Sequence, residues 1–217
     1  MKLKKIASLM LAGVMAVSML AGCSNGTKPD DDKKDPVVDS SLTGKVIAAL
    51  SEDTTKVVSF GSDSDLDAAV AKLIENFGVN NLNKIKASEL KNINDDISDK
   101  TAFDFGKTST DKNAAEKDAK EASVTVILTQ NQLDDLKGAS TEYAVKMIAD
   151  LIDDKIEDLE LKENSKTYTY DTDKGDFWYD FSYTGNLSVT EVKDAVTGVS
   201  SYVVVCTIAR TSAEQTK

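Results

Sequence analysis

The sequence predicts an α+β fold in which an antiparallel sheet carries two main amphipathic helices on one face. Apolar residues recur at helical spacing over residues 62–78 and again over residues 141–160, a pattern that gives a helix one buried face. The C-terminal part of the chain is instead rich in short runs of Val, Ile, Tyr and Phe, which favour strands. Together these patterns predict helices and a sheet packed around one core.

The first elements of the domain are a short helix at residues 42–50 and a strand at residues 55–60. The helix at 62–78 opens with Ser and Asp residues, whose side chains cap free N–H groups and complement the positive end of the helix dipole. Gly78 is expected to end this helix with a left-handed cap, because glycine adopts a positive φ without strain. Residues 79–100 predict helical turns between loops.

The middle of the chain is more varied. Phe103, Asp104 and Phe105 predict a short strand, whereas residues 111–122 are rich in Ala, Lys and acids and predict an exposed helix or a mobile loop. Residues 124–128 are apolar almost throughout and predict a strand. The helix at 141–160 has the clearest pattern, with an apolar face formed by Ala144, Ile148, Leu151, Ile152, Ile156 and Leu159.

The C-terminal strands are expected to form two hairpins. Residues 167–171 and 177–183 flank an Asp-Lys-Gly-Asp turn, in which glycine supplies the positive φ that tight turns require. Residues 187–192 and 202–209 form the second pair, and the polar tail at 211–217 should fray. A strand-rich C-terminal half follows from this pattern.

The order of these elements suggests an internal duplication. Two aromatic-Asp-Phe strands, 103–105 and 179–181, each lie downstream of an amphipathic helix and upstream of a second apolar strand. One hypothesis is that the domain consists of two duplicated halves of helix and strands. The alternative is that two short strands of a common type match by chance.

The N-terminus has three parts that occur together in secretory signals. Met1–Lys5 is positively charged, Ile6–Leu20 is uncharged and apolar but short for a membrane span, and small residues follow. Leu20-Ala21-Gly22-Cys23 resembles the lipobox of bacterial prelipoproteins. The resemblance implies cleavage before Cys23 and diacylglycerol on its thiol. Two or more acyl chains give stable anchoring, since each buried methylene contributes about 0.8 kcal/mol.

Three regions follow from this resemblance and from composition. Residues 1–22 are expected to be a lipoprotein signal peptide, and residues 23–40 a lipidated Cys with a disordered, charge-dense tether. Residues 41–217 are expected to form a single extracytoplasmic domain, because that length suffices for one real core. The localisation expected is outside the cytoplasm, lipid-anchored to the bacterial membrane.

Charge and missing residue types exclude several functions. The net charge of −11 repels phosphate backbones, so nucleic acid is not an expected partner. The chain has no His, which excludes Ser–His–Asp and Cys–His triads and His-ligated zinc. Arg210 is the only Arg, and Cys206, the one Cys besides Cys23, lies in an apolar strand where a core thiol is favoured over a reactive one.

Aromatic residues gather in one stretch of the chain. Seven lie between residues 168 and 183, and strand alternation places Phe177, Tyr179, Phe181 and Tyr183 on one face with Trp178 on the other. A functional interpretation is a flat platform that stacks a sugar or peptide. The alternative, which is favoured, is that the rings pack in the core. The candidate binding residues are Tyr168, Tyr170, Trp178, Tyr179 and Tyr183.

Carboxylates offer a second candidate site. Asp104 and Asp180 occupy matching positions in the two similar strands, and a glycosidase would need such a pair within a single cleft. Solvent-facing strand residues are the favoured alternative. The Asp-rich stretch at 171–180 does not match a calcium loop, because Gly175 and Asp176 fall at the wrong positions. No metal or cofactor is therefore expected.

The function that these observations favour is non-catalytic. We expect a membrane-anchored lipoprotein that binds a cell-envelope glycan or a protein partner through its β-rich half. Three alternatives stay open: a carboxylate-dependent hydrolase at the cell surface, a solute-binding receptor of a transporter, and a purely structural or accessory protein. A solute receptor usually has two larger α/β lobes built from βαβ units, and no such series is visible here.

Overall fold

Two long strands form the centre of the sheet. β4 (Phe177–Lys193) and β5 (Ser200–Thr216) pair antiparallel along their whole length, from Phe177↔Thr216 to Lys193↔Ser200. The structure is a computed structural model that describes residues 37–39, 42–105, 122–128, 130–165, 167–168 and 176–216. These residues belong to one compact unit, Asp35–Lys217.

The long hairpin corrects two expectations. The predicted pairing of residues 187–192 with residues 202–209 is confirmed, as in Leu187↔Cys206 and Val189↔Val204. Its separation from residues 177–183 is wrong, because residues 177–183 and 187–192 are parts of the single strand β4. The tail predicted to fray is also paired, since Thr211–Thr216 lie opposite Phe177–Ser182 in the ladder. A polar composition misleads here, because main-chain hydrogen bonds to β4 hold the tail whatever its side chains are.

The remaining strands make the sheet mixed. β3 (Ala122–Leu128) pairs antiparallel with β5, and β1 (Val37–Asp39) pairs antiparallel with β4. β2 (Val58–Ser62) also pairs with β4, but runs parallel to it. The α+β class is therefore confirmed, whereas the expectation of a purely antiparallel sheet is wrong at this one pair.

One edge of β4 is shared among segments that are far apart in the sequence. β1 covers residues 191–193, β2 covers residues 183–187, and the chain after the last helix covers the first part of the strand. In that last part the N–H of Ser165 donates to the Tyr179 carbonyl at 2.7 Å, and Tyr168 and Phe177 exchange two main-chain bonds. The other edge of β4 is occupied by β5 alone.

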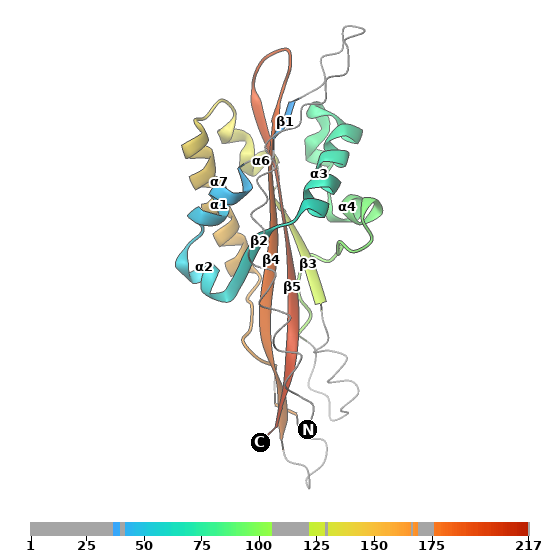
Figure 1. Ribbon diagram of the computed structural model, residues 1–217, viewed down its shortest axis with the longest axis vertical. Helices are drawn as coiled ribbons and strands as arrows, with labels where there is room; N and C mark the ends of the chain where they lie inside the picture. The colour runs from blue at the N-terminus through green and yellow to red at the C-terminus, as the bar shows by residue number, and fades with distance from the viewer. Residues whose placement is uncertain are drawn as a thin grey trace. The chain divides into compact units, whose positions relative to one another are not determined.

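Helices cover both faces of the sheet (Figure 1). One layer contains α1 (Thr43–Ala49), α2 (Glu52–Val57), α6 (Gln130–Leu133), the 3-10 helix η2 (Asp134–Leu136) and α7 (Thr141–Asp158). The other contains α3 (Ser64–Phe77), the 3-10 helix η1 (Val79–Lys84) and α4 (Ala87–Ile93). The two main amphipathic helices, α3 and α7, therefore lie on opposite faces, and the prediction that they share one face is wrong.

The pattern of β5 explains the two helical layers. Val204 and Cys206 pack in the cluster that contains α7, whereas Val203 and Val205 pack in the cluster that contains α3. Both sets are buried. A strand that is apolar on both faces requires cover on both faces, so the run Tyr202–Ile208 itself demands two layers.

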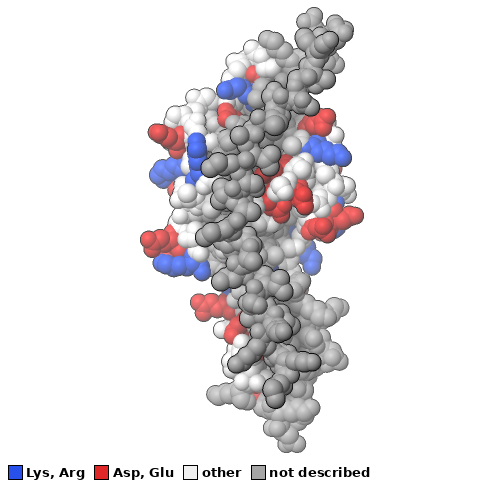
Figure 2. Space-filling view, in the orientation of Figure 1, with Lys and Arg blue, Asp and Glu red and all other residues white. Residues whose placement is uncertain are grey.

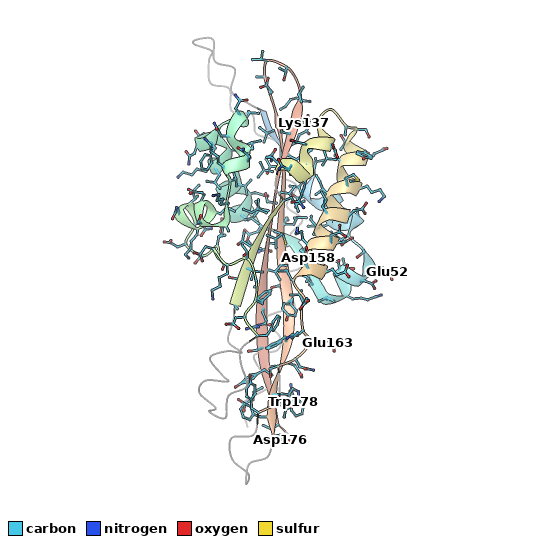
Figure 3. The ribbon with its side chains drawn as sticks, turned by 180° about the vertical axis from the view of Figure 1, so that it is seen from behind. Glu52, Lys137, Asp158, Glu163, Asp176 and Trp178 are labelled. Atoms are coloured by element: carbon cyan, nitrogen blue, oxygen red, sulfur yellow. The ribbon has the colours of Figure 1, made fainter. Side chains whose placement is uncertain are left out.

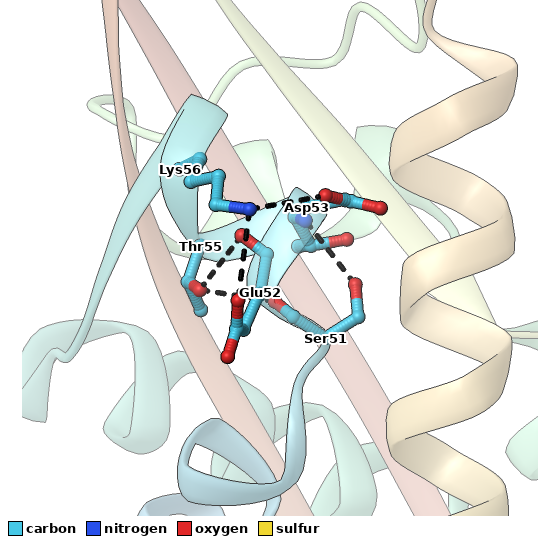
Figure 4. Close-up of polar contacts among 6 residues, drawn as sticks. Ser51, Glu52, Asp53, Thr55 and Lys56 are labelled. Carbon is cyan, nitrogen blue, oxygen red and sulfur yellow. Dashed lines mark hydrogen bonds and ion pairs between the residues drawn. The ribbon is translucent and has the colours of Figure 1, made fainter.

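A capped turn of helix replaces the start of the predicted strand at 55–60 (Figure 4). The Ser51 hydroxyl accepts from the N–H of Thr54 at 3.2 Å, and the Thr55 hydroxyl donates to the Ser51 carbonyl at 3.0 Å. Lys56 lies within 3.6 Å of the carboxylates of Glu52 and Asp53. These local bonds favour helix through Val57, and only Val58 onward joins the sheet.

The two long helices form as predicted. The Asp63 carboxylate caps α3 by accepting from the N–H groups of Asp65 and Leu66, and Ser140 caps α7 by accepting from the N–H of Tyr143. Gly78 follows α3 with a φ of 69° and a ψ of 164°, so it has the expected positive φ but not the left-handed helical conformation of the predicted cap. Ile148 and Ile152 of α7 are buried in the core, as helical spacing predicts.

The hypothesis of two duplicated halves is wrong. Phe103–Phe105 is not a strand, whereas Tyr179–Phe181 is the beginning of β4. The Phe103 and Phe105 rings instead pack on Tyr183 and Phe181, at centroid distances of 5.5 and 6.1 Å. The two segments thus contact each other in one aromatic cluster rather than occupying equivalent positions.

Candidate functional site

The aromatic residues proposed for binding are mostly core residues. Tyr168, Tyr179 and Tyr183 are only 3%, 5% and 5% exposed, so their rings offer no open face to a ligand. The Tyr168 ring stacks on Phe177 at 5.4 Å, and burial raises the pKa of Tyr183. Tyr170 lies outside the described residues.

Trp178 differs from these rings because it projects from the other face of β4 (Figure 3). It is half-buried, and its indole N–H donates to the Asp180 carboxylate at 3.1 Å. Figure 3 places it near one end of the hairpin, beyond the helices. A single partly covered ring gives no stacking platform.

The only Arg has a structural place. Arg210 is 2% exposed, and its guanidinium carbon lies 4.6 Å from the Phe181 ring centre and 5.3 Å from that of Phe105. Its Nη1 donates to the Asp104 carbonyl at 3.1 Å. Cation–π contact of this kind stabilises a buried guanidinium, so Arg210 holds the 103–105 segment against the sheet instead of facing a ligand.

Asp104 and Asp180 are not brought together in one cleft. Asp180 shares a face of β4 with Trp178, whereas the neighbours of Asp104 pack on Phe181 and Tyr183, which project from the opposite face. Both side chains are exposed. Among the residues that the structure describes, no group of three Asp, Glu, Cys or His side chains could hold a metal ion.

Of the two cysteines, Cys206 is a described core residue and Cys23 is not described. Cys206 is 2% exposed, and burial raises the pKa of its thiol to about 12, which confirms the prediction of an inert core thiol. Cys23 lies outside the described residues, so the anchor stays a prediction. Within the described part of the chain no helix has the length and apolarity needed to span a bilayer.

The candidate site is a cleft beside β3, which sequence patterns did not identify. It has a volume of about 610 Å³ and lies between the outer strand β3 and the chain of η1 and α4. Pockets of this size commonly bind ligands when an apolar lining carries a few polar groups. The lining here combines both kinds of residue, with Leu82, Ile85, Ala87, Ile127, Leu128 and Val203 as apolar members and Asn83, Lys86, Asp99, Thr101, Thr125, Gln130 and Asn131 as polar ones.

The cleft begins where residues 98–100 stop covering the outer edge of β3. The N–H of Thr125 donates to the Lys100 carbonyl at 2.7 Å, and the Thr125 hydroxyl donates to the Ser98 carbonyl at 2.6 Å. Residues 98–100 therefore cover the strand up to Thr125. The cleft opens directly beyond, beside Ile127.

Amide side chains extend the cleft into a second hollow. Asn83, Gln130 and Asn131 line both this cleft and a neighbouring one of about 510 Å³. Gln130 is held in place because its amide donates to the Tyr202 carbonyl at 2.7 Å. Neutral amides that both donate and accept suit an uncharged polar ligand or a peptide main chain.

Charges of both signs are mixed on the face of the molecule seen in Figure 2. On the face seen in Figure 2, Lys and Arg side chains lie beside Asp and Glu side chains over both helical layers. The described part of this face therefore has no extended positive patch. A search of protein-family models, of curated proteins and of solved structures finds no significant match to this chain.

Proposed function

We propose that the protein is a membrane-anchored extracytoplasmic lipoprotein whose domain binds a partner, a cell-envelope glycan or another protein, without catalysing a reaction. The anchor is supported by the lipobox-like Leu20–Cys23. The binding role is supported by one observation, the cleft beside β3 with its apolar lining and amide rim.

The chemistry of the cleft favours binding over catalysis. Its ionisable side chains among the described residues are Lys86 and Asp99, and both are exposed to solvent. General acid–base catalysis needs a group whose pKa is tuned by burial or by a close partner. A hydrolase that used Asp104 and Asp180 is disfavoured as well, because the neighbours of Asp104, Phe103 and Phe105, pack on the face of β4 opposite to the one from which Asp180 projects.

The anchor is tested by fractionation of cells that express the full chain. Cys23→Ala should move the protein from the membrane to the soluble fraction and abolish incorporation of labelled palmitate, because the acyl acceptor is lost. Cys206→Ala is the matched control, since its buried thiol should play no part in anchoring. Retention of Cys23→Ala at the membrane would refute the anchor.

A further inference from the structure

We propose that the cleft beside β3 binds an extended peptide of a partner protein, which adds to the sheet as a further strand. This inference rests on the proposed binding function and deepens it, because it selects a peptide main chain over a glycan. The inference starts from the main-chain groups of β3 at Thr125 and Ile127, two residues that line the cleft.

The register of β3 fixes which groups point outward. Since the N–H of Thr125 donates to Lys100 and not to β5, Thr125 faces away from its partner strand. In an antiparallel ladder this direction alternates, so the N–H and C=O of Ile127 also point away from β5. Among the described residues, the main-chain bond on this outer edge of β3 is the one from Thr125 to Lys100.

These outward groups are spaced for another strand. The Thr125 carbonyl and the Ile127 N–H and carbonyl repeat at the interval of an extended chain. A peptide of the same repeat satisfies all three, as in other cases of strand addition. Two residues earlier, the N–H of Thr125 on the same edge already donates to a main-chain carbonyl, that of Lys100.

The walls of the cleft favour a particular side-chain pattern. Ile85 and Ile127 line the cleft beside the edge of β3 to which a strand would add, and Val203 lines it from β5. Side chains of a strand alternate between two faces, so every second residue of the peptide would meet this apolar wall. We therefore infer a partner segment with apolar residues at alternate positions and no Pro at the pairing ones.

The size of the cleft sets the length of the segment. The outward groups available lie between Thr125 and Ile127, which limits main-chain pairing to about three hydrogen bonds, each of modest net strength in water. The remaining affinity must come from apolar contact in the cleft of about 610 Å³. The partner is thus a short motif rather than a whole strand of another sheet.

The test uses the full lipidated chain in detergent micelles and a phage-displayed library of random nine-residue peptides. Selected peptides should alternate apolar and polar residues, and their binding should slow hydrogen exchange at the Ile127 amide. A synthetic copy with N-methyl groups on the pairing amides should bind at least about tenfold more weakly, because the side chains stay while the main-chain donors are lost.

Three variants separate pairing from simple contact. Ile127→Pro removes the outward N–H and should weaken binding at least about tenfold, whereas Ile127→Val keeps it and should bind within about threefold of the original chain. Asn83→Trp changes an exposed rim residue, and should block the cleft without disturbing the core. The thermal unfolding of Asn83→Trp and of Ile127→Pro is measured together with binding, to show that each variant is folded.

Each other outcome overturns the inference. Selection of no peptide, equal binding by the N-methylated copy, or full binding by a folded Asn83→Trp would each reject strand addition. A glycan array that labels the chain in place of peptides, with loss in Asn83→Trp, would reject the peptide while leaving the binding function intact. Retention of Cys23→Ala at the membrane would refute the anchor of the proposed function and would leave the peptide-binding inference untouched.

Discussion

Gly185 is the position where the parallel pairing of β2 with β4 can be tested most directly. Phe60 lies opposite Gly185 in that pair. A Cβ at Gly185 would lie 2.5 Å from Cε1 and 2.7 Å from Cδ1 of the Phe60 ring, and 3.0 Å from Cγ1 of Val58. The ring thus covers the glycine, and no side chain fits between them.

The expected cost of Gly185→Ala follows from these distances. The Phe60 ring would have to retreat by roughly 1 Å to reach ordinary contact, and overpacking of this kind costs about 1–3 kcal/mol. The smaller entropy of the unfolded alanine chain offsets about 0.4–1 kcal/mol. We therefore expect a net loss of about 1–2 kcal/mol in the free energy of unfolding, or roughly 2–8 °C in Tm for a domain of this size.

The assay is urea unfolding followed by circular dichroism, with two controls. Gly61→Ala should be neutral or slightly stabilising, because its nearest neighbour, Asn186 Oδ1, would lie 3.9 Å away. In a Phe60→Ala background the penalty of Gly185→Ala should shrink by at least about 0.5 kcal/mol, since the ring is gone. A penalty of the same size in both backgrounds, or none in the original chain, would refute the close approach of β2 to β4.

Two further variants test the core and the α3 face. Ile148→Ala on α7 should lower the free energy of unfolding by about 2–5 kcal/mol in urea, because the side chain is fully buried. Tyr143 is exposed on the same helix, so Tyr143→Ala should change the free energy of unfolding by less than about 0.5 kcal/mol. Equal effects of the two variants would contradict the orientation of α7. Burial raises the pKa of Asp67, opposed by the Ser188 hydroxyl and reinforced by the Asp63 carboxylate, above the ordinary value of 3.8. The folded state therefore binds this proton more tightly than the unfolded chain, and ionised Asp67 destabilises the fold at neutral pH. Asp67→Asn should have a higher Tm than the original chain at pH 7, and the gain should disappear near pH 3; a gain that persists at low pH would contradict this cause.

Sequence patterns predicted the elements that depend on local or periodic signals. α3 and α7 were predicted because a helix with one buried face repeats its apolar positions over many residues, as Ile148, Ile152 and Ile156 do. The buried strand position of Cys206 was predicted because this residue lies in a nearly continuous apolar run, Tyr202–Ile208. These elements carry their own evidence in the sequence, whatever they pack against.

Long-range pairing set the limits of prediction. The partner of β2 lies more than a hundred residues away in β4. No residue type or spacing in Val58–Ser62 indicates that the two strands run parallel. The polar tail at Thr211–Thr216 is held by main-chain hydrogen bonds to β4, which its side-chain pattern does not predict. The cleft was missed for a similar reason, because it depends on where residues 98–100 stop covering β3.

The candidate aromatic site failed on burial rather than on geometry. Alternation placed Tyr179 and Tyr183 correctly on one face of β4, but alternation cannot say whether that face is open. The answer depends on Phe103, Phe105 and Tyr168, which come from other parts of the chain and cover the rings.

The shared edge of β4 has a consequence for synthesis. β1 and β2 leave the ribosome first, yet the strand on which both pair begins only at Phe177. Until β4 is synthesised, β1 and β2 lack the strand with which they pair, and pairings of such large sequence separation form slowly. A chain of this topology can complete its sheet only when synthesis is nearly finished, so the sheet forms after translation of β4 and β5 rather than strand by strand.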